Sequence, residues 1–220
     1  MYLPELENYL SEMGEPRFRA KQIFHWLQSG VTDFDEMTDI SKALRERLKA
    51  DAYIAGAETE RRYASRLDET VKYVFRLFDG ELIETVLMKY EHGYTVCIST
   101  QVGCRMGCKF CASGINGLTR SLTASEMLAQ ITAVQRDNNI RVSNIVMMGM
   151  GEPLDNFDNS VRFLKLVSDE NGLNIGLRHI SLSTSGVVSG IKKLKEYNLP
   201  ITLSISLHAP SDDIRSSVMP

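Results

Sequence analysis

The sequence predicts an α/β protein built from parallel strands that alternate with helices. From residue 94 onward, short apolar runs typical of buried strands are separated by segments with helical character, and the connections are short. The helix expected over 123–138 begins with Thr123 and Glu126, spaced as in a capping box. The other expected elements are helices over 158–168 and 187–197 and strands over 94–99, 143–148, 179–183 and 201–206. This alternation indicates about four βα units.

A small helical module is expected over residues 1–56, before the α/β part. Pro16 can open a helix that Gly30 can end. Four apolar residues repeat at helical spacing within it: Ala20, Ile23, Phe24 and Leu27. A second short helix is expected over 41–48. Apolar stripes of this kind are typical of a core, so they carry no information about function.

A β-hairpin is expected within residues 57–92, which link the helical module to the α/β part. Two β-rich runs, 71–78 and 82–89, are joined across Asp79-Gly80. An Asp-Gly pair between such runs is a strong hairpin signal.

Glu84 lies in the second strand of this hairpin, on the same face as Leu82 and Val86. A carboxylate on an apolar face is costly unless it is paired or used chemically. By position alone, an exposed sheet face is the simpler interpretation of Glu84.

Four polar segments follow the expected parallel strands, each at the point where a strand ends. Functional groups in parallel βα folds collect at the carboxyl ends of the strands, so we expect these segments to converge on one rim. They are the cysteine loop and residues 149–153, 183–186 and 206–208.

The cysteine loop carries Cys104, Cys108 and Cys111 in the spacing Cys-x3-Cys-x2-Cys. Three thiolates can hold three irons of a cubane cluster and leave the fourth iron open to a ligand, whereas a closed cluster normally takes four cysteines. A structural zinc site is the alternative, with His92 and Cys97 as the nearest additional ligands. Paired CxxC knuckles with zinc-type spacing are missing, which favours the cluster.

Bulk composition excludes few classes of protein. Hydrophobic residues make up 43% of the 220 residues and charged residues 24%, ordinary values for a globular protein, and the net charge of −3 does not indicate a nucleic-acid binder. Local basic clusters at 17–21, 42–49 and 61–66 are most simply solvated surfaces. With no secretory signal, no apolar run of membrane-spanning length and only four cysteines, we expect a cytoplasmic protein that has no membrane partner.

Several segments together carry a resemblance to a known family. They are Phe18–Trp26, Gly30–Phe34, Cys97–Ala112 with its three cysteines, Gly149–Pro153 and Ser206–Pro210. The chain resembles the radical S-adenosylmethionine (SAM) superfamily and, within it, the bacterial dual-specificity RNA methyltransferases that modify adenine carbon 2 in 23S ribosomal RNA and tRNA. The resemblance implies a partial (βα)6 barrel over 93–220, a β-hairpin extension over 57–92 and an RNA-binding-type helical domain over 1–56.

The resemblance also implies a role for each site residue. Cys104, Cys108 and Cys111 would hold a [4Fe-4S] cluster, Glu84 would be the proton acceptor, and Cys97 would help resolve an RNA adduct through a transient disulfide. The residues that match the SAM-binding segments are Gly151, Glu152, Ser183, Ser206, Leu207 and His208. A monomer that receives electrons from a donor such as flavodoxin is expected.

Other functions stay open at this level. They are methylation of adenine carbon 8, as in the antibiotic-resistance relatives, a radical SAM enzyme acting on a small molecule or peptide, and a non-enzymatic zinc-stabilised RNA-binding module. In the resembled family a later cysteine carries the methyl group, and all four cysteines here already have other roles. We therefore expect the 220-residue chain to be incomplete at its C-terminus and unable to complete methyl transfer.

Overall fold

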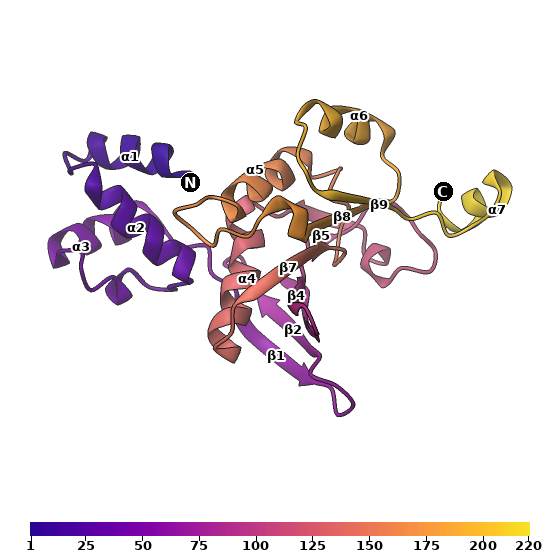
Figure 1. Cartoon of the computed structure of the whole chain (residues 1–220), viewed down its shortest axis with the longest axis horizontal. Coiled ribbons are helices and arrows are strands. Elements are labelled where there is room, and N and C mark those ends of the chain that lie inside the picture. Colours follow the sequence, from indigo (N-terminus) through magenta and orange to yellow (C-terminus); the bar gives the residue numbers. More distant parts are fainter.

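Seven strands form one mixed sheet in the order β1-β2-β3-β4-β7-β8-β9 in the computed structural model, which describes residues 1–220 (Figure 1). The first four pair antiparallel and the last three continue in parallel from β4. Their bounds are β1 (Glu58–Ala64), β2 (Val71–Arg76), β3 (Leu82–Tyr90), β4 (Gly93–Cys97), β7 (Val142–Met147), β8 (Ile180–Thr184) and β9 (Thr202–Ile205). A separate two-stranded sheet contains β5 (Gln101–Gly103) and β6 (Leu118–Ser121).

Each parallel strand is followed by a helix, which confirms the predicted α/β class and its four βα units. The helices are α4 (Ala124–Asn138), α5 (Phe157–Val167), α6 (Val188–Glu196) and the short α7 (Asp212–Val218). The capping box at the start of α4 is present, because the Thr123 hydroxyl accepts from the Glu126 N–H at 3.2 Å and the Glu126 carboxylate accepts from the Thr123 N–H at 2.8 Å.

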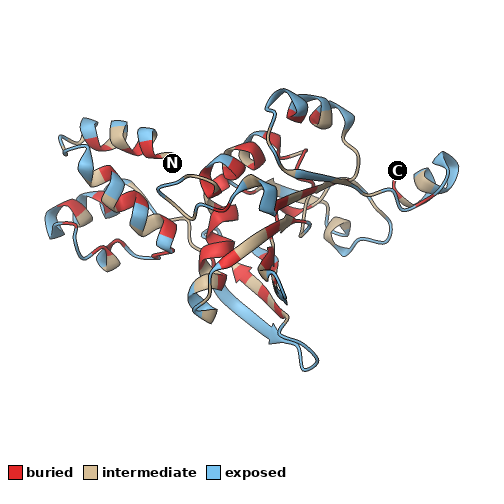
Figure 2. Cartoon of the chain, viewed as in Figure 1, coloured by how far each residue is buried: buried red, intermediate tan, exposed pale blue.

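The two faces of the parallel sheet differ in character. Val96, Ile145 and Leu182 are fully buried on one face and belong to the main hydrophobic core with residues of the flanking helices (Figure 2). The alternate residues Cys97 and Val146 pair in register and lie on the opposite face, where they are only half-buried. One face therefore supplies stability, while the other is accessible for chemistry.

The predicted hairpin is present as β2 and β3, and the turn between them contains Gly80 in the left-handed region at φ +86°. β1 was not predicted, since Glu58–Ala64 is charged and all seven of its residues are exposed. A charged edge strand of this kind resists pairing with other chains.

None of the helices has the length and apolar character that a membrane-spanning helix requires.

Three helices, α1 (Leu3–Glu12), α2 (Phe18–Ser29) and α3 (Lys42–Asp51), form the N-terminal module at the end of the molecule opposite α7 (Figure 1). α2 ends at Gly30 as predicted, with φ +85°, whereas α1 was not predicted as a separate helix. A Cβ at Gly30 would lie 2.6 Å from the Thr132 Cβ, so glycine also permits close packing on α4. The exact domain boundaries stay predictions.

Two arginines of the α/β helices bind this module through hydrogen bonds and ion pairs. Arg136 of α4 donates to the Gly30 carbonyl and pairs with Glu36 at 3.0 Å. Arg162 of α5 pairs with Glu5, and its guanidinium carbon lies 4.4 Å from the centre of the Tyr2 ring. A mainly apolar cavity of about 590 Å³ lies between the module and α4, away from the cysteine loop.

Gln130 fixes the segment that leads from β4 to the cysteine loop. Its fully buried carboxamide accepts from the Ser99 N–H and the Thr85 hydroxyl, both at 2.8 Å, and donates to the Ser99 carbonyl at 2.9 Å. The backbone here has no strand partner of its own on that side, so the side chain substitutes for one.

Replacing Gln130 by leucine is expected to lower the free energy of unfolding by about 2–4 kcal/mol, because buried polar groups lose their partners. Urea unfolding measures the change, with Gln22→Leu as the control because the Gln22 hydrogen bond to Asp39 is exposed. Equal, small losses in both variants would contradict this role for Gln130.

Candidate functional site

The cysteine loop connects β5 to β6. Gly103 precedes it at φ +75°, and a Cβ there would lie 2.0 Å from the Gly117 carbonyl oxygen, so only glycine allows the two ends of the loop to meet. All three thiols are free; those of Cys104 and Cys108 are half-buried, and that of Cys111 is exposed.

The three thiols are close enough to oppose one another's ionisation. Burial raises the pKa of Cys104 and of Cys108, and the neighbouring thiols and the Glu152 carboxylate raise both pKa values further. A bound metal would offset this effect, because it stabilises the thiolate form of its ligands. The donor set of three thiols in one loop therefore fits an iron–sulfur cluster with one iron left without a protein ligand.

The geometry does not favour the zinc alternative. No three His, Cys, Asp or Glu side chains are preassembled as a metal site, the three loop cysteines included, so the comparison depends on whether a fourth zinc ligand is within reach. His92 precedes β4 and stacks on Tyr90 at 5.3 Å between ring centres, whereas the cysteine loop follows the other end of that strand. A five-residue strand spans roughly 16 Å, so His92 is too distant to be a fourth ligand.

The segment after β7 lies directly against the segment after β4. The Gly149 N–H donates to the Ile98 carbonyl at 3.0 Å, and the Thr100 N–H donates to the Met150 carbonyl at 2.8 Å. A Cβ at Gly149 would be 2.7 Å from the Ile98 oxygen, and one at Gly151 would be 2.5 Å from the Gln101 Cβ. These glycines are therefore required for the close approach of the two segments.

Glu152 is the buried carboxylate of this rim, with an exposed fraction of 3%. One carboxylate oxygen accepts from the Ser185 N–H at 2.7 Å and the other from the Leu154 N–H at 3.0 Å, while its own N–H donates to the Gln101 side chain at 2.9 Å. Each carboxylate oxygen can accept a second hydrogen bond, so the predicted contact with an ammonium group is compatible with these bonds.

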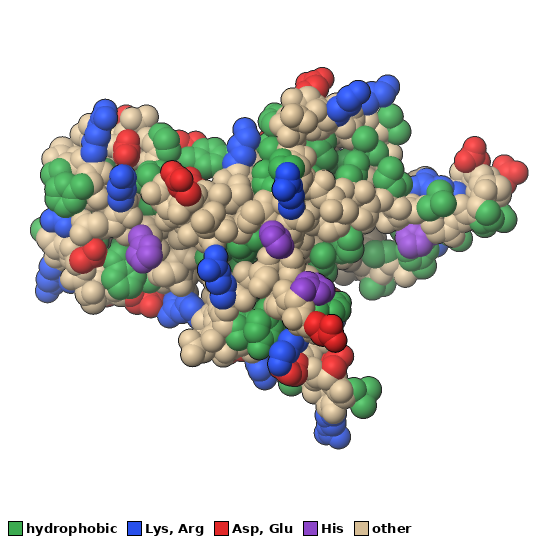
Figure 3. Space-filling model, viewed as in Figure 1, with side chains coloured by type: hydrophobic (Ala, Val, Ile, Leu, Met, Phe, Trp, Pro, Cys, Tyr) green, Lys and Arg blue, Asp and Glu red, His purple; other side chains and the backbone are tan.

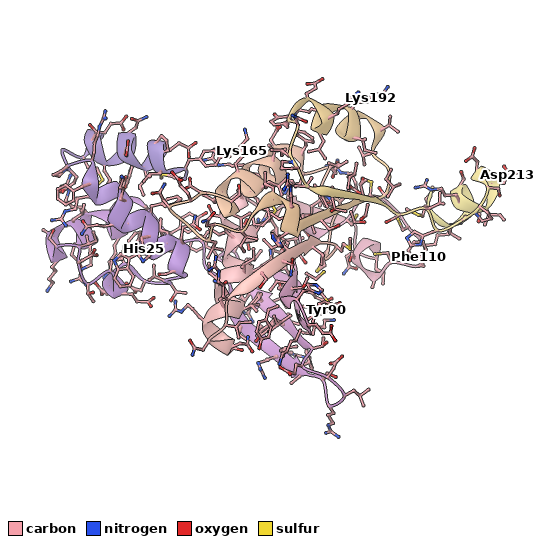
Figure 4. The ribbon with its side chains drawn as sticks, viewed as in Figure 1. His25, Tyr90, Phe110, Lys165, Lys192 and Asp213 are labelled. Carbon is pink, nitrogen blue, oxygen red and sulfur yellow. The ribbon has the colours of Figure 1, made fainter.

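The serines predicted at the ends of β8 and β9 lie side by side. The hydroxyl oxygens of Ser183 and Ser206 are 3.5 Å apart. His208 has φ +55° and presents its ring to the edge of Phe110 at 4.9 Å between centres, while Leu207 is exposed. Phe110 belongs to the cysteine loop, and Figure 4 shows it between the sheet and α7, which carries Asp213. The structure thus brings together the rim segments that the sequence separates.

Glu84 and Cys97 share the open face of the sheet. Val86 pairs in register with Cys97, and Glu84 lies two residues before Val86, so its side chain emerges on the same face. The Ser99 hydroxyl donates to the Glu84 carbonyl at 2.6 Å, which places Glu84 at the end of β4 nearest the cysteine loop. Its carboxylate pairs with the Lys72 ammonium at 2.6 Å.

Sequence reasoning missed three residues that organise this region: Lys72, Gln101 and Asp155. The Asp155 carboxylate accepts from the Gln101 side chain and from Arg105, both at 2.9 Å. The position of Gln101 just before the cysteine motif was a usable signal, whereas Lys72 looks like any polar residue of an alternating strand. All four cysteines are free, so the expected disulfide has no support in the structure.

Residues 98–220 match the family model of the radical SAM superfamily. The chain belongs to the radical SAM superfamily. Members of this superfamily use SAM and a [4Fe-4S] cluster, in agreement with the donor set of the cysteine loop. Residues 1–54 match a second model, described as the ribosomal RNA large subunit methyltransferase N-terminal domain.

Similar proteins cover nearly the whole chain. A probable dual-specificity RNA methyltransferase RlmN from Alkaliphilus oremlandii is 56% identical over 99% of this chain, and one from Alkaliphilus metalliredigens is 54% identical over 99%. The chain spans 64% and 62% of the length of these relatives. The crystal structure of a radical SAM methyltransferase from Sphaerobacter thermophilus superimposes with a TM-score of 0.94 at 46% identity, covering 100% of this chain and 66% of that one.

Replacing Glu152 by glutamine is expected to lower the free energy of unfolding by about 1–3 kcal/mol. The amide NH2 would face a backbone N–H that now donates to an oxygen, leaving that N–H without an acceptor. Urea unfolding provides the measurement, with the exposed Glu58→Gln as control. A loss no greater than that of the control would show that these two hydrogen bonds do not stabilise the rim.

Cys97 is expected to be the slowest thiol to react with iodoacetamide in the cluster-free protein. Burial raises the pKa of Cys97, so the unreactive thiol form persists at neutral pH, and alkylation should accelerate only at a pH above that at which an exposed thiol ionises. Mass spectrometry of the labelled peptides compares Cys97 with the exposed Cys111. Equal rates for the two cysteines at pH 7 would contradict the greater burial of Cys97 relative to Cys111.

Proposed function

We propose that the protein is a radical SAM methyltransferase that modifies carbon 2 of adenine in 23S ribosomal RNA and tRNA. The observation that carries the proposal is the convergence of a three-thiol loop with the polar ends of the parallel strands, in a chain whose first 54 residues match an RNA methyltransferase domain. The relatives named dual-specificity RNA methyltransferase RlmN favour this over the carbon-8 alternative and over a small-molecule or peptide substrate.

The cysteine loop would hold the cluster through Cys104, Cys108 and Cys111. Bound together with SAM and reduced by one electron from an external donor, a cluster of this kind would supply a 5′-deoxyadenosyl radical, with methionine as the other product. The SAM-contacting groups in the proposal are the Glu152 carboxylate, the backbone at Gly151 and the polar groups of the neighbouring strand ends: Ser183, Ser206, Leu207 and His208.

Glu84 is the proton acceptor in this proposal. Its carboxylate pairs with the Lys72 ammonium at 2.6 Å and lies on the open face, where a substrate could reach it. Cys97, on the same open face, would act as a thiol toward a substrate bound there, and a transient disulfide of Cys97 is part of the same proposal. The proposal also includes an electron donor such as flavodoxin and a monomeric state for the protein.

The N-terminal module would contribute to RNA binding. Arg17, Lys21 and Lys42 are exposed and form no ion pair, whereas Arg45, Arg47 and Lys49 are paired with carboxylates. Figure 3 shows Lys and Arg mixed with Asp and Glu over the visible face of this module. The unpaired cations are the ones available to phosphates.

Anaerobic reconstitution with iron and sulfide tests the cluster. The wild-type protein is expected to bind about four irons with matching acid-labile sulfide. Cys104→Ser, Cys108→Ser and Cys111→Ser are each expected to lose most of this iron. Cys97→Ser serves as the matched control and should retain it. Colourless wild-type protein that binds stoichiometric zinc instead would support the zinc-stabilised RNA-binding module.

Reversing three unpaired charges tests the RNA surface. The triple variant Arg17→Glu, Lys21→Glu, Lys42→Glu is expected to bind tRNA about tenfold more weakly and with a shallower salt dependence. The control changes three exposed cations elsewhere by the same total charge: Arg178→Glu, Lys192→Glu and Lys195→Glu. Equal weakening in both variants would assign the effect to net charge alone and remove the module from the proposal.

A further inference from the structure

The chain that follows β9 folds back against the cysteine loop. The Lys109 N–H donates to the Val218 carbonyl at 2.9 Å, and a Cβ at Gly107 would lie 3.5 Å from the Pro220 ring. Together with the edge contact between Phe110 and His208, these contacts make the β9–α7 segment one wall of the loop. α7 is too short and exposed to be stable alone, so its position depends on such contacts.

Arg215 of α7 connects the ends of β8 and β9. Its guanidinium donates to the Ser185 carbonyl and, at 3.3 Å, to the Ser206 carbonyl. Ser185 in turn donates its N–H to the buried Glu152 carboxylate. A continuous chain of hydrogen bonds therefore runs from the segment after β7, through the end of β8, to the end of β9.

The charge of Arg215 is not neutralised by an ion pair. No carboxylate lies within salt-bridge distance of it, although Asp212 and Asp213 belong to the same helix. The bond from the Lys109 N–H to the Val218 carbonyl places α7, the helix that carries Arg215, against the cysteine loop. An arginine is always protonated, so this positive charge beside the cysteine loop is permanent.

We infer that Arg215 is a positioning residue that holds the ends of β8 and β9 together and supplies a fixed positive charge on the helix beside the cysteine loop. The inference rests on the proposed function, in which the ends of these strands carry groups that contact SAM. The two hydrogen bonds of Arg215 to the Ser185 and Ser206 carbonyls form a bridge that should make SAM binding tighter than in a variant without them. The charge predicts easier reduction of the cluster, because a nearby cation stabilises the added negative charge.

Two variants separate the bridge from the charge. Both bonds of Arg215 come from its Nη2 atom. Arg215→Lys keeps a cation, but its ammonium is one bond closer to the backbone than Nη2 and is expected not to reach both carbonyls. Arg215→Met removes both the charge and the donor and keeps a comparable apolar stem. Lys192→Met, on the exposed surface of α6, is the control for loss of one positive charge.

Three measurements are made on the full chain. Hydrogen–deuterium exchange of the cluster-free protein reports on peptides that cover residues 183–187 and 206–209. Equilibrium dialysis gives the affinity of the reconstituted protein for SAM. An electron paramagnetic resonance titration gives the midpoint potential of its cluster.

In Arg215→Met we expect faster exchange confined to these two peptides, about tenfold weaker SAM binding and a more negative midpoint potential. Arg215→Lys should share the faster exchange and weaker SAM binding but keep a potential close to that of the wild type. Lys192→Met should match the wild type in all three measurements.

Unchanged SAM affinity and potential in Arg215→Met would overturn the inference. Faster exchange across the whole protein would also overturn it, since Arg215 would then be a general stabilising residue. If the wild-type protein itself binds neither cluster nor SAM, the proposed function fails, an outcome distinct from failure of the Arg215 bridge.

Discussion

The arrangement of the rim depends on one buried carboxylate. Glu152 joins three stretches of chain, because its backbone donates to the Gln101 side chain and its carboxylate accepts from the N–H groups of Leu154 and Ser185. A buried charge is stable only when hydrogen bonds replace its hydration, so the surrounding backbone must stay in place. Gly149 and Gly151 allow the segment that carries Glu152 to lie close to the segment after β4. The same residue that fixes the rim thus keeps a charged group beneath the cysteine loop.

The two faces of the parallel sheet have different roles: one is buried against the helices and the other is accessible. Val96, Ile145 and Leu182 bury one face against the helices and contribute to stability through the main hydrophobic core. The opposite face carries Glu84 and Cys97 and stays accessible beside the loop. Substitutions on the open face can therefore alter chemistry with little cost in stability, whereas those on the helix face act through packing.

The sequence was sufficient for the elements whose signals are local. The capping box at Thr123, the hairpin turn at Gly80 and the alternation of strands and helices all correspond to observed elements. The convergence of the cysteine loop with Ser183 and Ser206 could also be predicted, since parallel strands end at a common edge.

Other features depend on pairing that no local pattern specifies. β1 has no apolar alternation, because it is an exposed edge strand held by its backbone bonds to β2. Lys72 meets Glu84 only through the register of β2 on β3. Glu152 was predicted as a group for a ligand, but its bonds to backbone N–H groups at 2.7 and 3.0 Å give it a structural role as well.

The central claim is that the three-thiol loop and the rim act together as one SAM-binding cluster site. The most direct test is the electron paramagnetic resonance spectrum of the reduced, reconstituted protein with and without SAM. If the cluster has an open iron beside this rim, its spectrum should change when SAM is added. The spectrum should not change when adenosine, which lacks the methionine part of SAM, is added instead. A cluster spectrum that is identical with and without SAM would contradict the account.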